Sequence, residues 1–161
     1  MATALRRHPP VDVLIVDDDH VFAEALARRL SHEAGVGEVE LVFSADEARH
    51  CLAGHRPDVV LLDYNLGADH DDASSLGLLE EIETRSDPPA VLMLSGSQNV
   101  SDIAHAVDLG ASGWLVKGIT AHDLLAAFDR ALDGELVLPE GAVASLVHYL
   151  LDELHRRGTP A

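Results

Sequence analysis

Short apolar runs alternate along the chain with segments whose apolar residues recur every three or four positions. The five runs span residues 13–16, 39–43, 59–62, 91–94 and 114–116. Runs of this length predict strands and the intervening segments predict helices, an alternation typical of an α/β fold with a parallel sheet. Four runs are nearly continuous in apolar character, which indicates strands covered by helices on both faces. We therefore expect a doubly wound, five-stranded parallel sheet.

Two predicted helices begin with residues typical of helix N-terminal caps. Ser44 with Glu47, and Thr120 with Asp123, fit the capping pattern in which a side chain satisfies a free backbone amide. The second pair begins a helix over residues 121–132, whose apolar residues form one stripe. A similar stripe over residues 21–30 predicts the first helix.

A further apolar stripe follows Gly134 and Pro139. Its members recur at helical spacing: Val143, Leu146, Val147, Leu150, Leu151 and Leu154. This predicts an extra C-terminal helix outside the alternating core. We favour a helix docked on its own domain, with a contact in a homodimer as the alternative. The expected organisation is a flexible tail over 1–10, one main domain over 11–135, and a linker with an amphipathic helix over 136–161.

Composition narrows the class of protein. The 161 residues, 47% of them hydrophobic and 24% charged, suit one compact globular domain. Residues 1–10 lack the features of a secretory signal and no run is long enough to span a membrane, so we expect a cytoplasmic protein. The formal net charge of −17 argues against binding nucleic acid by this chain alone. The single cysteine, Cys51, reads as a small core residue.

The most informative residues are those that end the apolar runs. Asp17 and Asp18 follow the first run, Asp63 the third, Ser95 the fourth and Lys117 the fifth. Ligands of open parallel sheets bind at the carboxyl ends of the strands, so these side chains should converge. Crowded carboxylates need a positive partner. Mg²⁺, or Mn²⁺ in its place, prefers oxygen ligands and leaves positions open for phosphoryl oxygens.

Lys117 strengthens this hypothesis, because it is the only lysine beside ten arginines. A compact ammonium differs chemically from a planar guanidinium, which suggests a specific demand at that position. Helix capping by Asp18 or Asp19 is the simpler explanation of the acidic run, but a cap needs one residue only. His20 and His70 suggest a transition-metal site, which we set aside because the ten histidines show no paired ligand spacing.

Four segments in order, "VLIVDDDH", "PDVVLLDYNL", "VLMLSGS" and "GASGWLVKG", resemble the receiver domains of two-component response regulators. The resemblance covers about residues 11–138 and implies a flavodoxin-like strand order of 2-1-3-4-5. The later stretch "ALDGELVLPEGAVASLV" resembles the end of receivers in LuxR-type, NarL-like transcription regulators. It leads us to expect a DNA-binding domain beyond this chain; the alternative is a stand-alone receiver that acts through protein contacts.

The resemblance implies a phosphorylation switch rather than an enzyme. Asp63 would accept a phosphoryl group from a sensor histidine kinase, with Lys117 and Ser95 at the phosphoryl oxygens. The implied metal ligands are Asp17, Asp18, Asp63 and the backbone carbonyl of Asn65. Ser95 and Trp114 would act as the switch pair, with Trp114 moving into the space that Ser95 vacates. The responsive surface would be formed by the fourth helix, fifth strand and fifth helix.

Departures and alternatives stay open. The loop "LGADHDDASSLG" after Asp63 is longer than the family pattern, and its segment from Asp69 to Ser75 carries Asp71 and Asp72. A solvated loop is favoured; the sharper hypothesis is that the charge of Asp69, Asp71 and Asp72 tunes cation affinity and slows anionic phosphodonors. A haloacid dehalogenase-like phosphatase with Asp17 as nucleophile lacks its later acidic pair. A docking or dimerisation module without phosphorylation is the third alternative.

Overall fold

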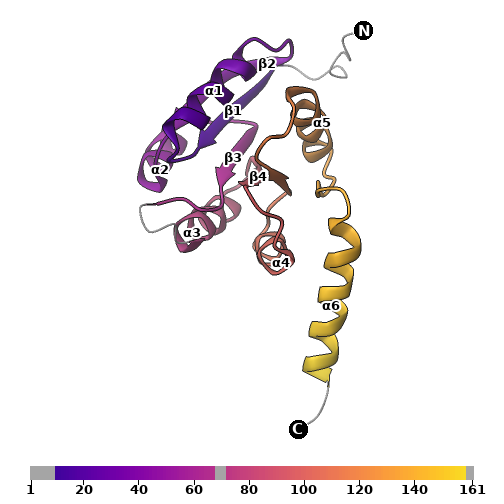
Figure 1. Ribbon diagram of the computed structural model, residues 1–161. Coiled ribbons are helices and arrows are strands. Elements are labelled where there is room, and N and C mark those ends of the chain that lie inside the picture. Colours follow the sequence, from indigo (N-terminus) through magenta and orange to yellow (C-terminus); the bar gives the residue numbers. More distant parts are fainter. Residues whose placement is uncertain (1–9, 68–71, 159–161) are drawn as a thin grey trace.

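The structure is a computed structural model that describes residues 10–67 and 72–158. Five parallel strands form one sheet in the order β2-β1-β3-β4-β5 (Figure 1). The strands are β1 (Val11–Val16), β2 (Val36–Val42), β3 (Val59–Asp63), β4 (Ala90–Ser95) and β5 (Gly113–Val116). The helices are α1 (His20–Ser31), α2 (Ala45–Gly54), α3 (Asp72–Glu83), α4 (Val100–Asp108), α5 (Ala121–Leu132) and α6 (Ala142–Gly158). The predicted doubly wound sheet and its strand order are confirmed.

Alternate residues of each strand feed two separate cores, one on each face of the sheet. On β1, Leu14 and Val16 join a core with α2, α3 and α4, while Val13 and Ile15 join a core with α1 and α5. Each face of the central strands is covered, and this is why β3 is buried along its whole length. The sheet is thereby a rigid platform for the residues at its ends.

Helix starts agree with the capping patterns. Ser44 accepts a hydrogen bond from the backbone N–H of Glu47 at 3.1 Å, and Thr120 accepts one from Asp123 at 3.1 Å. Asp19 caps α1 and accepts from the N–H of Phe22. A capping role within the acidic run is therefore correct for Asp19, which leaves Asp17 and Asp18 without that explanation.

Cys51 corrects one expectation. It is only half buried, and its thiol donates a hydrogen bond to Glu40 on β2. Its helix neighbours Ala48 and Leu52 are the buried core residues of α2. The position of Cys51 on the helix turns its side chain toward the edge strand β2, whose exposed border carries carboxylates.

The C-terminal helix α6 extends away from the body and contacts α4 (Figure 1). Ala142 and Leu146 are buried, which confirms docking at the start of the helix. The rest of the predicted stripe is exposed: Val143 59%, Val147 49%, Leu150 49%, Leu151 46% and Leu154 65%. Docking on its own domain is thus correct for the first turns and wrong for the remainder. Within residues 10–67 and 72–158, no helix has the length and apolar character needed to cross a membrane.

Candidate functional site

The strand register brings four of the strand ends to one edge of the sheet. Val16 pairs with Leu62, so Asp17 and Asp63 follow side by side. Val116 of β5 pairs with Ser95 of β4, and the backbone N–H of Lys117 donates to the carbonyl of Ser95 at 2.8 Å. A difference of one residue in any pairing would turn these side chains away from the edge.

Three carboxylates meet at this edge. One oxygen from each of Asp17, Asp18 and Asp63 lies within 4.8 Å of the others. Asp17 is fully buried and Asp63 is 3% exposed, while Asp18 is half buried. The convergence expected from the sequence is therefore present, with two of its three carboxylates removed from solvent.

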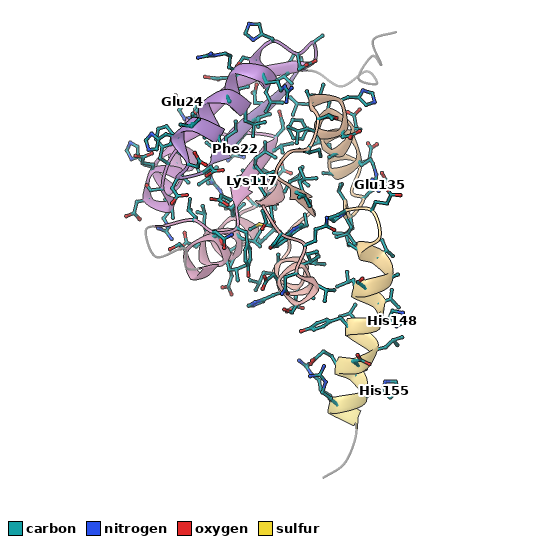
Figure 2. All side chains as sticks on the ribbon, viewed as in Figure 1. Phe22, Glu24, Lys117, Glu135, His148 and His155 are labelled. Atoms are coloured by element: carbon teal, nitrogen blue, oxygen red, sulfur yellow. The ribbon has the colours of Figure 1, made fainter. Side chains whose placement is uncertain are left out.

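Lys117 supplies a positive charge to the same cluster. Its Nζ lies 3.1 Å from Asp17 Oδ2 and 3.4 Å from Asp63 Oδ1. The ring of Phe22 lies beneath the ammonium, 4.8 Å from Nζ to the ring centroid, and Figure 2 shows the two side chains near one another. Phe22 lies within the apolar stripe of residues 21–30, and its sequence pattern gives no signal for this contact. A cation over an aromatic face is an attractive contact, and here it helps to fix the direction of the lysine.

The charges of the cluster perturb one another. Burial and the neighbouring charge of Asp17 raise the pKa of Asp63 from its ordinary 3.8 to about 6, although Lys117 and the N–H of Asn65 favour the ionised form. Burial of Lys117 acts to lower its pKa, but the adjacent Asp63 and Asp17 outweigh burial, and the net pKa is raised. Lys117 therefore stays charged, and one lysine does not fully offset the carboxylates.

The carboxylates fit a hard divalent cation. Asp17 Oδ1 accepts a hydrogen bond from the N–H of Asp19 at 2.9 Å. Asp17 Oδ2 is buried and has no hydrogen-bond partner among the described residues; its contact with Lys117 lacks hydrogen-bond geometry. A buried carboxylate oxygen with an ion pair but no hydrogen bond is incompletely satisfied, and coordination of Mg²⁺ by the oxygen cluster would complete its interactions.

The remaining predicted residues lie around this cluster with different local roles. Asn65 is exposed, and its backbone N–H donates to Asp63 Oδ1 at 3.2 Å. Ser95 is fully buried, and its hydroxyl accepts from the N–H of Ser97 at 3.1 Å. The loop residues Asp69, His70 and Asp71 lie outside the described residues, as does the side chain of Asp72.

Trp114 is already inside the protein. Only 1% of it is exposed, and its indole Nε1–H donates to the carbonyl of Ser97 at 3.0 Å. The ring of Tyr64 packs against it with centroids 4.9 Å apart. Trp114 is therefore already turned inward in this conformation, where its indole N–H is held by the carbonyl of the exposed loop residue Ser97.

Comparison with known proteins agrees with this fold. Residues 13–129 match the response regulator receiver domain. The chain is 36% identical to the acid tolerance regulatory protein ActR of Sinorhizobium medicae over 131 residues, which are 81% of this chain and 64% of ActR. It is 32% identical to NarL, a transcriptional regulatory protein of Mycobacterium tuberculosis, over 155 residues, 93% of this chain and 66% of NarL.

Solved structures share the architecture. The crystal structure of a LuxR-family two-component response regulator from Aurantimonas sp. SI85-9A1 superposes with a TM-score of 0.76 at 20% identity, covering 88% of this chain and 99% of that one. The chain belongs to the response regulator receiver domain family, whose members are phosphoacceptor signalling modules rather than enzymes. The haloacid dehalogenase alternative for Asp17 is accordingly wrong.

Proposed function

We propose that this chain is a phosphorylation-dependent switch in which Asp63 accepts a phosphoryl group from a sensor histidine kinase. The observation that carries the proposal is the pairing of a nearly buried carboxylate, at the end of a central strand, with a lysine 3.4 Å away and two further carboxylates beside it. A structural ion pair would not need the surplus of negative charge. Membership of the receiver family supports the same conclusion.

Each side chain has a proposed task in the transfer. An oxygen of Asp63 attacks the phosphorus of a phosphohistidine in line, the P–N bond breaks, and an acyl phosphate remains on Asp63. Lys117 neutralises charge on the phosphoryl oxygens. Asp17, Asp18, Asp63 and the Asn65 carbonyl would hold Mg²⁺ or Mn²⁺, which supplies charge neutralisation and orientation when bound. The N–H of Asn65 helps to fix the direction of the Asp63 carboxylate.

The proposed switch runs from Ser95 to the surface. When the Ser95 hydroxyl turns toward a phosphoryl oxygen, it gives up the N–H of Ser97. Trp114 is bound to the carbonyl of the same Ser97, so a change in this loop reaches the indole directly. Trp114 lies on β5 between α4 and α5, and we place the output surface on these three elements. Phosphorylation would shift the equilibrium between two conformations of this surface.

The partners and output are part of the proposal. The chain spans 64% of ActR and 66% of NarL, so control of transcription would involve a DNA-binding region outside these residues. We expect no nucleic-acid binding by this chain alone, a cytoplasmic location, and no membrane contact. The exposed apolar stripe of α6 is the proposed contact in a homodimer, which the solution mass with and without residues 136–161 would test.

The lone Trp114 gives a direct test. Its fluorescence is followed while Mg²⁺ and then a beryllium fluoride mimic of the phosphoryl group are added. The wild type is expected to respond to the mimic, whereas Asp63→Asn is expected to lose that response. A response that survives in Asp63→Asn would contradict the proposal. No response in either protein would favour a docking module that works without phosphorylation.

A further inference from the structure

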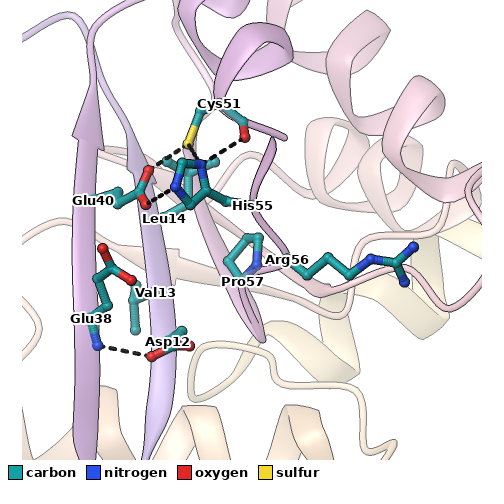
Figure 3. A pocket seen from close by; sticks show the side chains of 9 residues that line it. All are labelled: Asp12, Val13, Leu14, Glu38, Glu40, Cys51, His55, Arg56 and Pro57. Atoms are coloured by element: carbon teal, nitrogen blue, oxygen red, sulfur yellow. Dashed lines mark hydrogen bonds and ion pairs between the residues drawn. The ribbon is translucent and has the colours of Figure 1, made fainter. Parts of the chain in front are cut away.

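A second group of metal-ligating side chains, separate from Asp17, Asp18 and Asp63, lies between the end of α2 and the edge strand β2. Glu40, Cys51 and His55 each offer one atom within 4.8 Å of the others (Figure 3). The group sits in a small pocket whose lining also includes Asp12, Glu38 and Arg56. Paired histidine spacing in the sequence gives no signal for this group, which combines Cys51 in the last turn of α2 with His55 at its C-cap.

The three side chains already face one another. Cys51 Sγ lies 2.6 Å from Glu40 Oε2, and His55 Nε2 lies 3.3 Å from Glu40 Oε1. The separation of Cys51 Sγ from His55 Nδ1 is 4.0 Å. Ligand atoms of a tetrahedral zinc ion with ordinary bond lengths are about 3.3–3.6 Å apart. The separation of His55 Nε2 from Glu40 Oε1 therefore already matches a zinc site, whereas Cys51 Sγ and Glu40 Oε2 must move apart by about 1 Å.

The orientation of His55 is prepared for metal binding. Its Nδ1 lies 3.3 Å from the backbone carbonyl of Cys51, the usual partner of a ring N–H at a helix end. When Nδ1 carries the only ring proton and donates to that carbonyl, the lone pair of Nε2 faces the Glu40 carboxylate oxygen 3.3 Å away, an arrangement that a cation between the two atoms would stabilise. A second-shell hydrogen bond of this kind selects the tautomer of metal-binding histidines and increases their basicity.

The donor set selects the metal. A thiolate and an imidazole are poor ligands for Mg²⁺ and good ligands for Zn²⁺, and the carboxylate of Glu40 adds a third ligand of a type that zinc accepts. We propose that Glu40, Cys51 and His55 form a zinc-binding site, with water in the fourth position. The side chain of His55 is 57% exposed, so the ion has an open path and the water has room. The site ties the end of α2 to the border of β2.

Binding requires one proton to leave. The Cys51 thiol donates to Glu40 in the metal-free protein, and formation of the Zn–S bond releases this proton to solvent. The contact of 2.6 Å between Sγ and Oε2 must open by about 1 Å as both atoms become ligands. Because Glu40 is on an edge strand and its side chain is 28% exposed, it has room for that movement.

Burial, the hydrogen bond to Glu40 and the charge of Glu38 raise the pKa of Cys51 to about 12, so the thiol carries its proton in the metal-free protein at neutral pH. A bound metal ion must displace that proton.

The sole cysteine provides an unambiguous readout. The full chain is titrated with Co²⁺, which substitutes for Zn²⁺ and absorbs visible light. Excess Mg²⁺ is present to occupy the carboxylates of Asp17, Asp18 and Asp63. A thiolate-to-cobalt charge-transfer band can arise only from Cys51, since the chain has one cysteine. We expect one equivalent to develop this band with a tetrahedral visible spectrum, and Zn²⁺ to abolish both.

Variants separate the site from chance binding by surface histidines. Cys51→Ser is expected to lose the band, and His55→Gln and Glu40→Gln to weaken Zn²⁺ binding in calorimetry by about 100-fold and 10-fold or more. His50→Gln, on α2 and also exposed, is the matched control and should bind as the wild type does. Circular dichroism confirms that each variant folds. The absence of a charge-transfer band in the wild type, or Zn²⁺ affinity that is unchanged in Cys51→Ser, would overturn the proposal.

Discussion

Replacing Asp63 with asparagine should make the metal-free protein more stable at neutral pH. Asp63 is 3% exposed, and burial with the charge of Asp17 holds its pKa at about 6 instead of 3.8. Ionising it in the folded protein is therefore harder than in the unfolded chain. The difference corresponds to about 3 kcal/mol, at about 1.4 kcal/mol for each tenfold change. Asparagine has nearly the same shape without the charge, so we expect a gain of about 2–3 kcal/mol at pH 7.5.

The sign of the pH dependence follows from the raised pKa. Below about pH 3.8 Asp63 is protonated in both states and exerts no penalty. The penalty grows as pH rises through the interval from 3.8 to about 6 and is complete above it. The advantage of Asp63→Asn over the wild type should therefore shrink toward zero as the pH is lowered to about 4. A constant advantage across this range would point to packing rather than charge.

The assay is urea unfolding in EDTA, followed by Trp114 fluorescence at several pH values. Asp152→Asn on exposed α6 is the matched control and should shift stability by less than about 0.5 kcal/mol. Mg²⁺ at ten times its dissociation constant should stabilise the wild type by about 1.4 kcal/mol and the variant by less. The reasoning is refuted if Asp63→Asn at pH 7.5 is equal to or less stable than the wild type in EDTA.

Three further predictions concern single side chains. Lys117→Met should lower the rate of phosphorylation by a small-molecule phosphodonor about 100-fold, measured by intact mass, because its charge on the phosphoryl oxygens is lost. Phe128→Ala should lower the free energy of unfolding by about 3–5 kcal/mol in urea, since the ring is fully buried between α5 and the sheet. Iodoacetamide should alkylate Cys51 in the metal-free protein about 1,000-fold more slowly at pH 8 than a thiol with the ordinary pKa of 9.0, and Glu40→Gln should speed the reaction.

Much of the fold was predictable because buried central strands appear in the sequence as continuous apolar runs. The predicted range for β3 was 59–62 and the observed strand is Val59–Asp63. β2 was predicted to begin at Val39, but it begins at Val36. The first residues of this edge strand, such as Glu38, face solvent and leave no apolar signal. The site residues follow the ends of the strands. The sequence alone therefore predicted that the carboxylates and Lys117 lie together.

The orientations of Trp114, Glu40 and Cys51 could not be predicted from the sequence. The hydrogen bond that holds Trp114 inside depends on the loop carbonyl of Ser97, 17 positions away. The grouping of Glu40 with Cys51 depends on where α2 ends against β2. The exposed stripe of α6 had the same periodicity as a buried one, because periodicity reports which residues share a face and not what covers that face.

The most direct test of the central claim is to locate the phosphoryl group. The full chain is incubated with Mg²⁺ and a small-molecule phosphodonor, and the acyl phosphate is trapped and mapped by peptide mass spectrometry. The account predicts one added phosphoryl group, on Asp63, and none in Asp63→Asn. A phosphoryl group on Asp17 or Asp18, or an unmodified Asp63 in folded protein with Mg²⁺ bound, would contradict it.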